Sequence, residues 1–326
     1  MKDRIKGMMM GVAIGDALGQ PHENQPALGY PVKSYPPTGG QTTDDWQMTA
    51  AMARALMKGD GFDMNFMVAE HVAAYDEGTR GWGGAHRNAC AMLKQGVSPR
   101  ETGKLALDTA KPYRGRGNGM CMKITPLAAL HFVKNVPLAH RLQPLGDLAM
   151  MTHATGMGLS SAAAMEEAVI YCLKQTPSTF DPDGFLTAVQ QTAKLAEGWV
   201  QNEPDGPADR LSERLTHLLE NWRKMSPEDV SETYKGGGYV YESLPFALAF
   251  FCMGRHGPDC VYDCVGSGGD TDTNGSMVAA LVGALHGEEI FSKSLLYKLI
   301  GFPDIDHLSE QFAAWCDKID TGINVS

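Results

Sequence analysis

Residues 5–18 of this 326-residue chain read IKGMMMGVAIGDAL, with small and apolar side chains on nearly every side of a helix. A helix that is apolar almost all round is buried on most of its faces. The run is also too short, and too soon interrupted by Asp16, to be the core of a signal peptide. We therefore expect residues 5–18 to form a central helix.

Helical periodicity continues through most of the chain, which is rich in Ala, Leu and Met and poor in alternating β-branched runs. The sequence therefore predicts an all-α protein. Ser226-Pro227-Glu228-Asp229 is typical of a helix start, because Ser caps and acids favour the first turn. Further helices are expected from Thr125 and at 44–57, 65–75, 86–93, 138–150, 159–173, 184–200, 208–222, 243–252, 273–286, 289–300 and 306–318.

Composition restricts the function classes. Hydrophobic residues make up 43% of the chain, charged residues 20%, and the formal net charge is −10, which disfavours general nucleic-acid binding. Seven Cys without CxxC pairs indicate reduced, buried thiols rather than a disulfide framework. Since no stretch reaches the roughly 18 apolar residues of a membrane span, we expect a cytoplasmic protein without membrane contact.

Residues 19–42 form a long segment that cannot be a continuous helix. Five prolines and the pair Gly39-Gly40 interrupt it. Loops of this length inside a compact protein are usually functional, although a surface loop without a role is the alternative.

Two acidic segments stand where loops are expected to meet helices: Thr42-Thr43-Asp44-Asp45 and, far along the chain, residues 268–273, GGDTDT. Either segment alone could simply cap the following helix. Paired acids exceed what a cap needs, and carboxylates with Thr hydroxyls suit hard cations such as Mg²⁺ or Mn²⁺. An EF-hand is excluded, because its twelfth position from Asp270 is Leu281 rather than an acid.

A third segment, residues 115–120 with the sequence GRGNGM, is rich in Gly and flanked by Lys111, Arg114 and Lys123. Successive backbone amides next to Gly can form a concavity for phosphate, although a plain flexible loop is the alternative. A similar turn at residues 80–84, RGWGG, adds an aromatic side chain. Trp82 and Tyr113 could stack on a base, but aromatic residues more often lie in the core.

In this order and spacing the segments resemble the ADP-ribosylglycohydrolase family, of the dinitrogenase reductase-activating glycohydrolase and ADP-ribosylhydrolase type. The resemblance covers nearly the whole chain. It is carried by Gly15-Asp16-Ala17-Leu18-Gly19 with Glu23, Thr43-Asp44-Asp45, Gly117-Asn118-Gly119 with Pro126, Thr152-His153, residues 242–245, and Gly269-Asp270-Thr271-Asp272-Thr273.

The resemblance implies a compact orthogonal multi-helix fold, with residues 1–326 as a single domain and two Mg²⁺ (or Mn²⁺) ions as cofactors. It implies a monomer acting on ADP-ribose or an ADP-ribosylated protein, with Asp16 behind the ligands and Glu23 on a mobile substrate loop. The implied metal ligands are Thr43, Asp44, Asp45, Asp270, Asp272 and Thr273. The implied substrate contacts are Gly115, Arg116, Gly117, Asn118, Gly119, Met120 and His153.

The implied activity is metal-dependent hydrolysis of the glycosidic bond between ADP-ribose and a modified target, with Glu23 or Asp272 managing the proton. Trp46 replaces a Thr common in relatives, at a position that is not a usual ligand. The 80–84 turn lacks an Asp of the nitrogenase-regulating members, so the acceptor linkage stays open. A two-metal phosphate-ester hydrolase and a non-catalytic ADP-ribose-binding protein remain alternatives.

Overall fold

The computed structural model of the chain describes residues 1–106, 115–199 and 210–321. Over these ranges the regular elements are α-helices and short 3-10 helices, and the only β pairing is two isolated bridges. The prediction of an all-α fold is confirmed.

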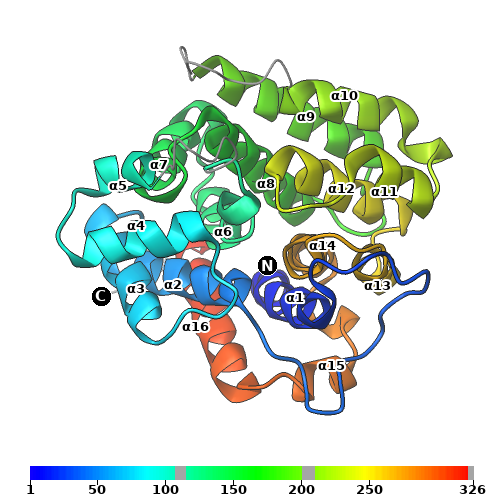
Figure 1. The fold of residues 1–326 in the computed structure, drawn as a ribbon, viewed down its shortest axis with the longest axis horizontal. Helices are drawn as coiled ribbons and strands as arrows, with labels where there is room; N and C mark the ends of the chain where they lie inside the picture. Colours follow the sequence, from blue (N-terminus) through cyan, green and yellow to red (C-terminus); the bar gives the residue numbers. More distant parts are fainter. Residues whose placement is uncertain (107–114, 200–209, 322–326) are drawn as a thin grey trace.

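At the centre of the molecule α1 (Lys2–Gly19) lies against α14 (Thr271–His286), as Figure 1 shows. The glycines of α1 recur every fourth residue and face α14. A Cβ atom at Gly11 would lie 2.2 Å from the carbonyl oxygen of Ala279, and one at Gly15 2.1 Å from that of Gly275. Only Gly permits so close a backbone approach. Residues 5–18 are thus central as predicted, and Asp16 is held beside the start of α14.

The other helices surround this pair. In the first half of the chain these are α2 (Asp44–Lys58), α3 (Met64–Asp76), α4 (Gly84–Lys94), α5 (Pro99–Leu105), α6 (Thr125–Val133), α7 (Leu138–Thr152) and α8 (Gly156–Lys174). The second half contributes α9 (Pro182–Trp199), α10 (Leu211–Asn221), α11 (Pro227–Tyr234), α12 (Val240–Met253), α13 (Pro258–Gly266), α15 (Lys293–Tyr297) and α16 (Phe302–Asp320). The 3-10 turns are η1 (Gln20–His22), η2 (Asn118–Met120), η3 (Trp222–Lys224) and η4 (Glu288–Ile290).

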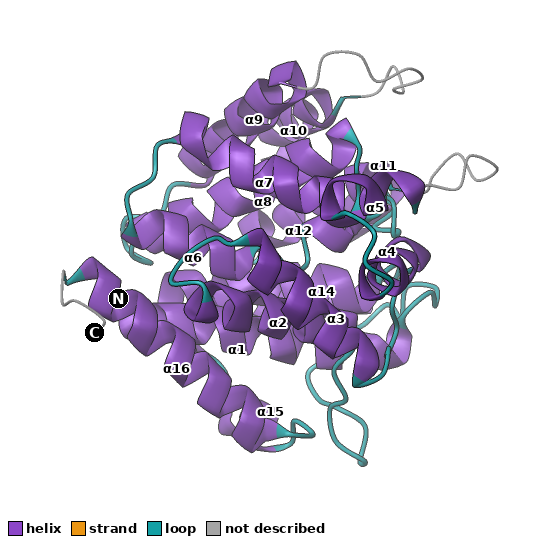
Figure 2. Ribbon diagram, turned by 90° about the vertical axis from the view of Figure 1, so that its left-hand side faces the viewer, coloured by secondary structure: helices purple, strands orange, loops and turns teal. Residues whose placement is uncertain are grey.

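Figures 1 and 2 agree on the arrangement. The helices α9 and α10 lie at one end of the molecule, α15 and α16 at the other, and α1 and α14 between them. The bulk of the buried apolar side chains forms one continuous core around α1.

Most predicted helices are present, with one correction. The helix expected at residues 289–300 is two short elements, η4 and α15, because the Ser292 side chain caps a new start by accepting from the amide of Leu295. The helices α5 and α13 were not predicted. The start at Ser226 is confirmed, and it carries a full capping box with Asp229.

The long segment between η1 and α2 is tied to the fold by its backbone. The amides of Leu28 and Val32 donate to carbonyls of Gly266 and Tyr262 near the end of α13. All seven Cys are free and buried, as expected. Among the described residues, none of the helices combines the length and apolar character needed to cross a membrane.

Candidate metal centre and ligand cavity

The two acidic segments meet at the end of α1. Thr43 Oγ1 lies 3.4 Å from Asp272 Oδ2, and Thr273 Oγ1 donates to Asp45 Oδ2 at 3.2 Å. Carboxylate oxygens of Asp16, Asp45 and Asp272 all lie within 4.8 Å of one another. The structure thus brings together segments more than 220 positions apart in the sequence.

Helix capping does not account for these residues. Thr43 and Asp270 stand at the N-cap positions of α2 and α14, but neither side chain makes a capping hydrogen bond. Asp16 of α1 provides the cap for α2 instead. Its carboxylate accepts from the amide of Thr43 at 2.8 and 2.9 Å and from that of Trp46 at 3.0 Å. Asp16 therefore positions the start of α2, in agreement with a supporting role behind the ligands.

The electrostatics of the cluster favour a bound cation. Burial raises the pKa of Asp44 to about 7, and burial with neighbouring carboxylates holds the pKa values of Asp45 and Asp272 well above the usual range. Asp45 Oδ1 is buried without a hydrogen-bond partner. Over the part of the chain that the structure describes, no Lys, Arg or His forms an ion pair with these carboxylates. The residues fit a divalent cation with oxygen ligands.

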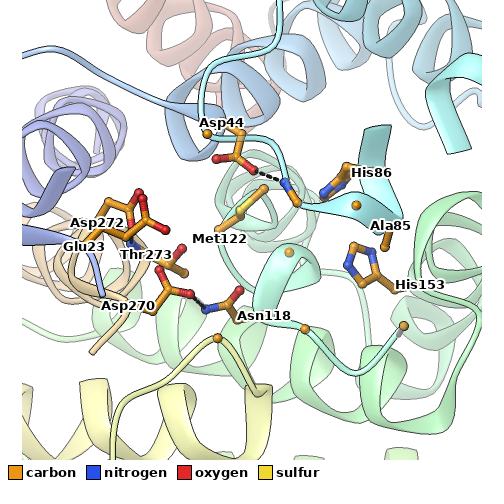
Figure 3. Close-up of a pocket in the computed structure, with 17 residues that line it drawn as sticks. Glu23, Asp44, Ala85, His86, Asn118, Met122, His153, Asp270, Asp272 and Thr273 are labelled. Atoms are coloured by element: carbon orange, nitrogen blue, oxygen red, sulfur yellow. Dashed lines mark hydrogen bonds between the residues drawn. The ribbon is translucent and has the colours of Figure 1, made fainter. Parts of the chain in front are cut away.

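A cavity of about 280 Å³ opens beside the acids, as Figure 3 shows. Glu23 follows η1 and reaches it, with its carboxylate within 4.8 Å of those of Asp270 and Asp272. Glu23 is half-buried, and burial with the nearby charge of Asp270 raises its pKa. Asp44 and Thr273 also line the cavity, whereas Thr43 and Asp45 lie behind its wall.

The Gly-rich segment forms another part of the wall. Gly115, Gly117, Asn118 and Gly119 line the cavity, and Asn118 Nδ2 donates to Asp270 Oδ2 at 2.9 Å. Arg116 and Met120 are not among the lining residues. The flanking Lys111 and Arg114, like Tyr113, lie outside the described residues.

The turn at residues 80–84 also approaches the acids. Gly81 and Gly83 line the cavity, and the amide of Gly83 donates to Asp44 Oδ2 at 3.4 Å. Trp82 is buried in a small core cluster, where its Nε1 donates to Gln47 Oε1 at 2.8 Å. Trp82 is therefore a core residue.

Two histidines complete the wall opposite the acids. His153, for which the resemblance implies a substrate contact, lines the cavity, and its ring centroid lies 4.8 Å from that of His86, which was not predicted. Behind them the fully buried Lys123 places its Nζ 2.7 Å from His86 Nε2. Burial lowers the pKa of Lys123 to about 7 and that of His153 to about 3. A single His in α4 gives no sequence signal for this contact.

Buried carboxylates beside a cavity of this kind could hold a divalent cation next to a bound small molecule. Comparison with known sequences gives the family. A sequence profile of the ADP-ribosylglycohydrolase family matches residues 1–320, and the chain belongs to this family. Membership supports a hydrolase that removes ADP-ribosyl groups.

Individual relatives agree. The chain is 26% identical to ADP-ribosylhydrolase ARH3 of Mus musculus, over 94% of this chain and 90% of the relative. It is 24% identical to the protein YegU of Escherichia coli K12, over 93% and 94% of the two chains. A solved structure named ADP-ribosylglycohydrolase-related protein complex covers 97% of this chain and 98% of its own, with a TM-score of 0.68 and 23% identity, which supports the fold.

Proposed function

We propose that this chain hydrolyses the glycosidic bond between ADP-ribose and a modified target, with two divalent cations, Mg²⁺ or Mn²⁺, as cofactors. The observation that carries the proposal is the convergence of buried carboxylates beside a cavity that a Gly-rich segment also lines. Asp272 borders this cavity, and Asp45, with its unpartnered Oδ1, lies behind its wall. Family membership supports the ADP-ribosyl part of the substrate.

The residues that would hold the cations are Thr43, Asp44, Asp45, Asp270, Asp272 and Thr273. All are on the loop-to-helix starts of α2 and α14, which lie against α1. Divalent cations held there would orient the hydroxyls of the reacting ribose and lower the pKa of the attacking water.

Glu23 is the better of the two candidate general bases. Among the described residues, the one hydrogen bond of its carboxylate is accepted by Oε1 from the neighbouring Asn24 Nδ2 at 3.0 Å, and the side chain borders the cavity. Both oxygens of Asp272 already have neighbours, since Oδ1 accepts from the amide of Thr273 and Oδ2 faces Thr43 Oγ1. Glu23 would therefore take a proton from the attacking water while Asp272 serves as a ligand.

The Gly-rich segment would bind the diphosphate of ADP-ribose. Gly115, Gly117 and Gly119 let backbone amides approach anionic oxygens closely. The hydrogen bond from Asn118 to Asp270 joins this segment to the acids. The groups that would bind the diphosphate and those that would bind the reacting ribose are therefore held in fixed relative positions.

One assay tests reaction and substrate together. The protein would be incubated with Arg-linked, Ser-linked and nucleic-acid-linked ADP-ribose, each with Mg²⁺, Mn²⁺ or chelator. We expect release of free ADP-ribose from at least one substrate, and its loss with chelator. Release of inorganic phosphate without ADP-ribose would instead identify a phosphate-ester hydrolase, and binding of ADP-ribose without any turnover would identify a non-catalytic member of the family.

A further inference from the structure

Lys123 lies between η2 and α6 and is completely buried, which is costly for an ammonium group. Over the part of the chain that the structure describes, no carboxylate pairs with it. Its Nζ contacts two neutral partners instead: His86 Nε2 at 2.7 Å and Thr152 Oγ1 at 3.1 Å. The charged side chain therefore constrains the hydrogen-bonding roles of the two groups that it contacts, His86 and Thr152.

The first contact determines the tautomer of His86. Below its pKa of about 7 the side chain of Lys123 is an ammonium group, which has three donors and no acceptor, so Nε2 of His86 must accept there. Burial and the charge of Lys123 lower the pKa of His86 well below its usual range, so the ring is neutral and its proton is on Nδ1. Nδ1 has no hydrogen-bond partner among the described residues, on a ring that lines the cavity.

The second contact reaches His153 through Thr152. The hydroxyl of Thr152 accepts from Lys123, and its own proton has two possible acceptors: His153 Nδ1 at 3.0 Å and Met120 Sδ at 3.6 Å. The imidazole nitrogen is closer and is a stronger acceptor than a thioether. His153 Nδ1 therefore accepts, and the proton of this neutral ring is on Nε2.

Both rings are packed against the Gly-rich segment. A Cβ atom at Gly119 would lie 2.8 Å from Cε1 of His86, 2.8 Å from Cε1 of His153 and 2.9 Å from Nε2 of His153. The two imidazoles thus flank the backbone expected to cradle phosphate, and Figure 3 shows them on the side of the cavity opposite the acids.

We propose that Lys123 is a positioning residue that fixes His86 and His153 in tautomers presenting N–H donors to the cavity, and that this donor pair binds the anionic oxygens of a diphosphate. An anion is the fitting ligand, because a charge-assisted hydrogen bond is stronger than a neutral one, and no carboxylate among the described residues pairs with the ammonium. Identifying the diphosphate as that of ADP-ribose rests on the proposed function.

The test uses Lys123→Met, which removes the charge and the donors at similar length, and Thr152→Val, which interrupts only the route to His153. Lys94→Met is the matched control, since Lys94 is an exposed residue paired with Asp76. Long-range ¹H–¹⁵N NMR of the ligand-free proteins reports each tautomer, with signals assigned through His86→Gln and His153→Gln. Calorimetry with inorganic pyrophosphate and with adenosine reports binding.

At pH 6, where Lys123 is charged and both rings are neutral, we expect the proton of His86 on Nδ1 and that of His153 on Nε2 in the wild type. In Lys123→Met both histidines should populate a mixture of tautomers. Pyrophosphate binding should be about 10- to 100-fold weaker, which is the contribution of a hydrogen bond to a charged group, while adenosine binding is unchanged. Thr152→Val should change the tautomer of His153 alone, and Lys94→Met should change neither the tautomers nor the binding.

The opposite tautomer at His86, or unchanged tautomers and pyrophosphate affinity in Lys123→Met, would overturn the inference. The tautomer readout needs neither substrate nor metal. If the wild type shows the expected tautomers and binds pyrophosphate but releases ADP-ribose from no substrate, the proposed function fails while the inference stands.

Discussion

The two sides of the cavity differ in charge and in how that charge is held. On one side, carboxylates from the ends of α1, α2 and α14 crowd together, with Asp45 Oδ1 unpartnered. On the other, the ammonium of Lys123 rests behind two neutral imidazoles. Figure 3 shows Glu23, Asp270 and Asp272 on one side of the space and His86 and His153 on the other, with Asp44 between the two groups. No ion pair joins the acids to Lys123, and this difference is the basis of our two proposals: cations on the acidic side and an anion on the histidine side.

Removing a ligand carboxylate should have the largest effect. Asp272→Ala leaves the fold in place but should lower the release of ADP-ribose by more than about 100-fold, since loss of mere outer-shell support already costs 10- to 100-fold. Turnover is measured with the best substrate of the linkage assay, and circular dichroism checks the helices. Wild-type turnover in a folded variant would contradict the metal site.

The second largest expected effect is the loss of stability when the metal is removed. On the proposed function, cations bind the acids of the native protein only, so Mg²⁺ or Mn²⁺ at about 100 times its Kd should stabilise the protein by about 2.7 kcal/mol over the chelated form. Thermal unfolding with chelator and with increasing metal measures this difference. An unfolding midpoint that is independent of metal would show that the acidic side holds no cation.

Loss of Asp16 should have a smaller effect, because it acts through its neighbours. In Asp16→Asn one carboxylate oxygen that accepts from Thr43 and Trp46 is replaced by an amide group that cannot accept. The start of α2 should then be less well positioned, with metal affinity about 10- to 100-fold lower. Calorimetric titration with Mn²⁺ measures this affinity. An unchanged affinity would show that Asp16 caps α2 without supporting the metal site.

The acidic side was largely predictable from the sequence, because its residues cluster in short segments of distinctive composition. Asp44-Asp45 and Asp270-x-Asp272 exceed what capping needs, and a helix apolar on all sides must be central. The cap that Asp16 gives to α2 could not be derived from local patterns, since it joins residues 27 and 30 positions apart.

The histidine side was predictable only in part. His153 came from the family resemblance, but His86 and Lys123 lie 37 positions apart on elements that no periodicity connects. Their contact depends on how α4 packs against the segment after η2, which the sequence does not state. The short helices α5 and α13 were missed for a related reason, because few residues leave little periodic signal.

Mn²⁺ binding to Asp45→Asn tests the central claim most directly, because this change keeps the shape of the side chain and removes the charge of the acid whose buried Oδ1 has no hydrogen-bond partner. A calorimetric titration of the wild type and of the variant gives both affinities. The account predicts saturable Mn²⁺ binding to the wild type, with affinity at least about 100-fold lower in the variant. Equal affinities, or no binding to the wild type, would contradict it.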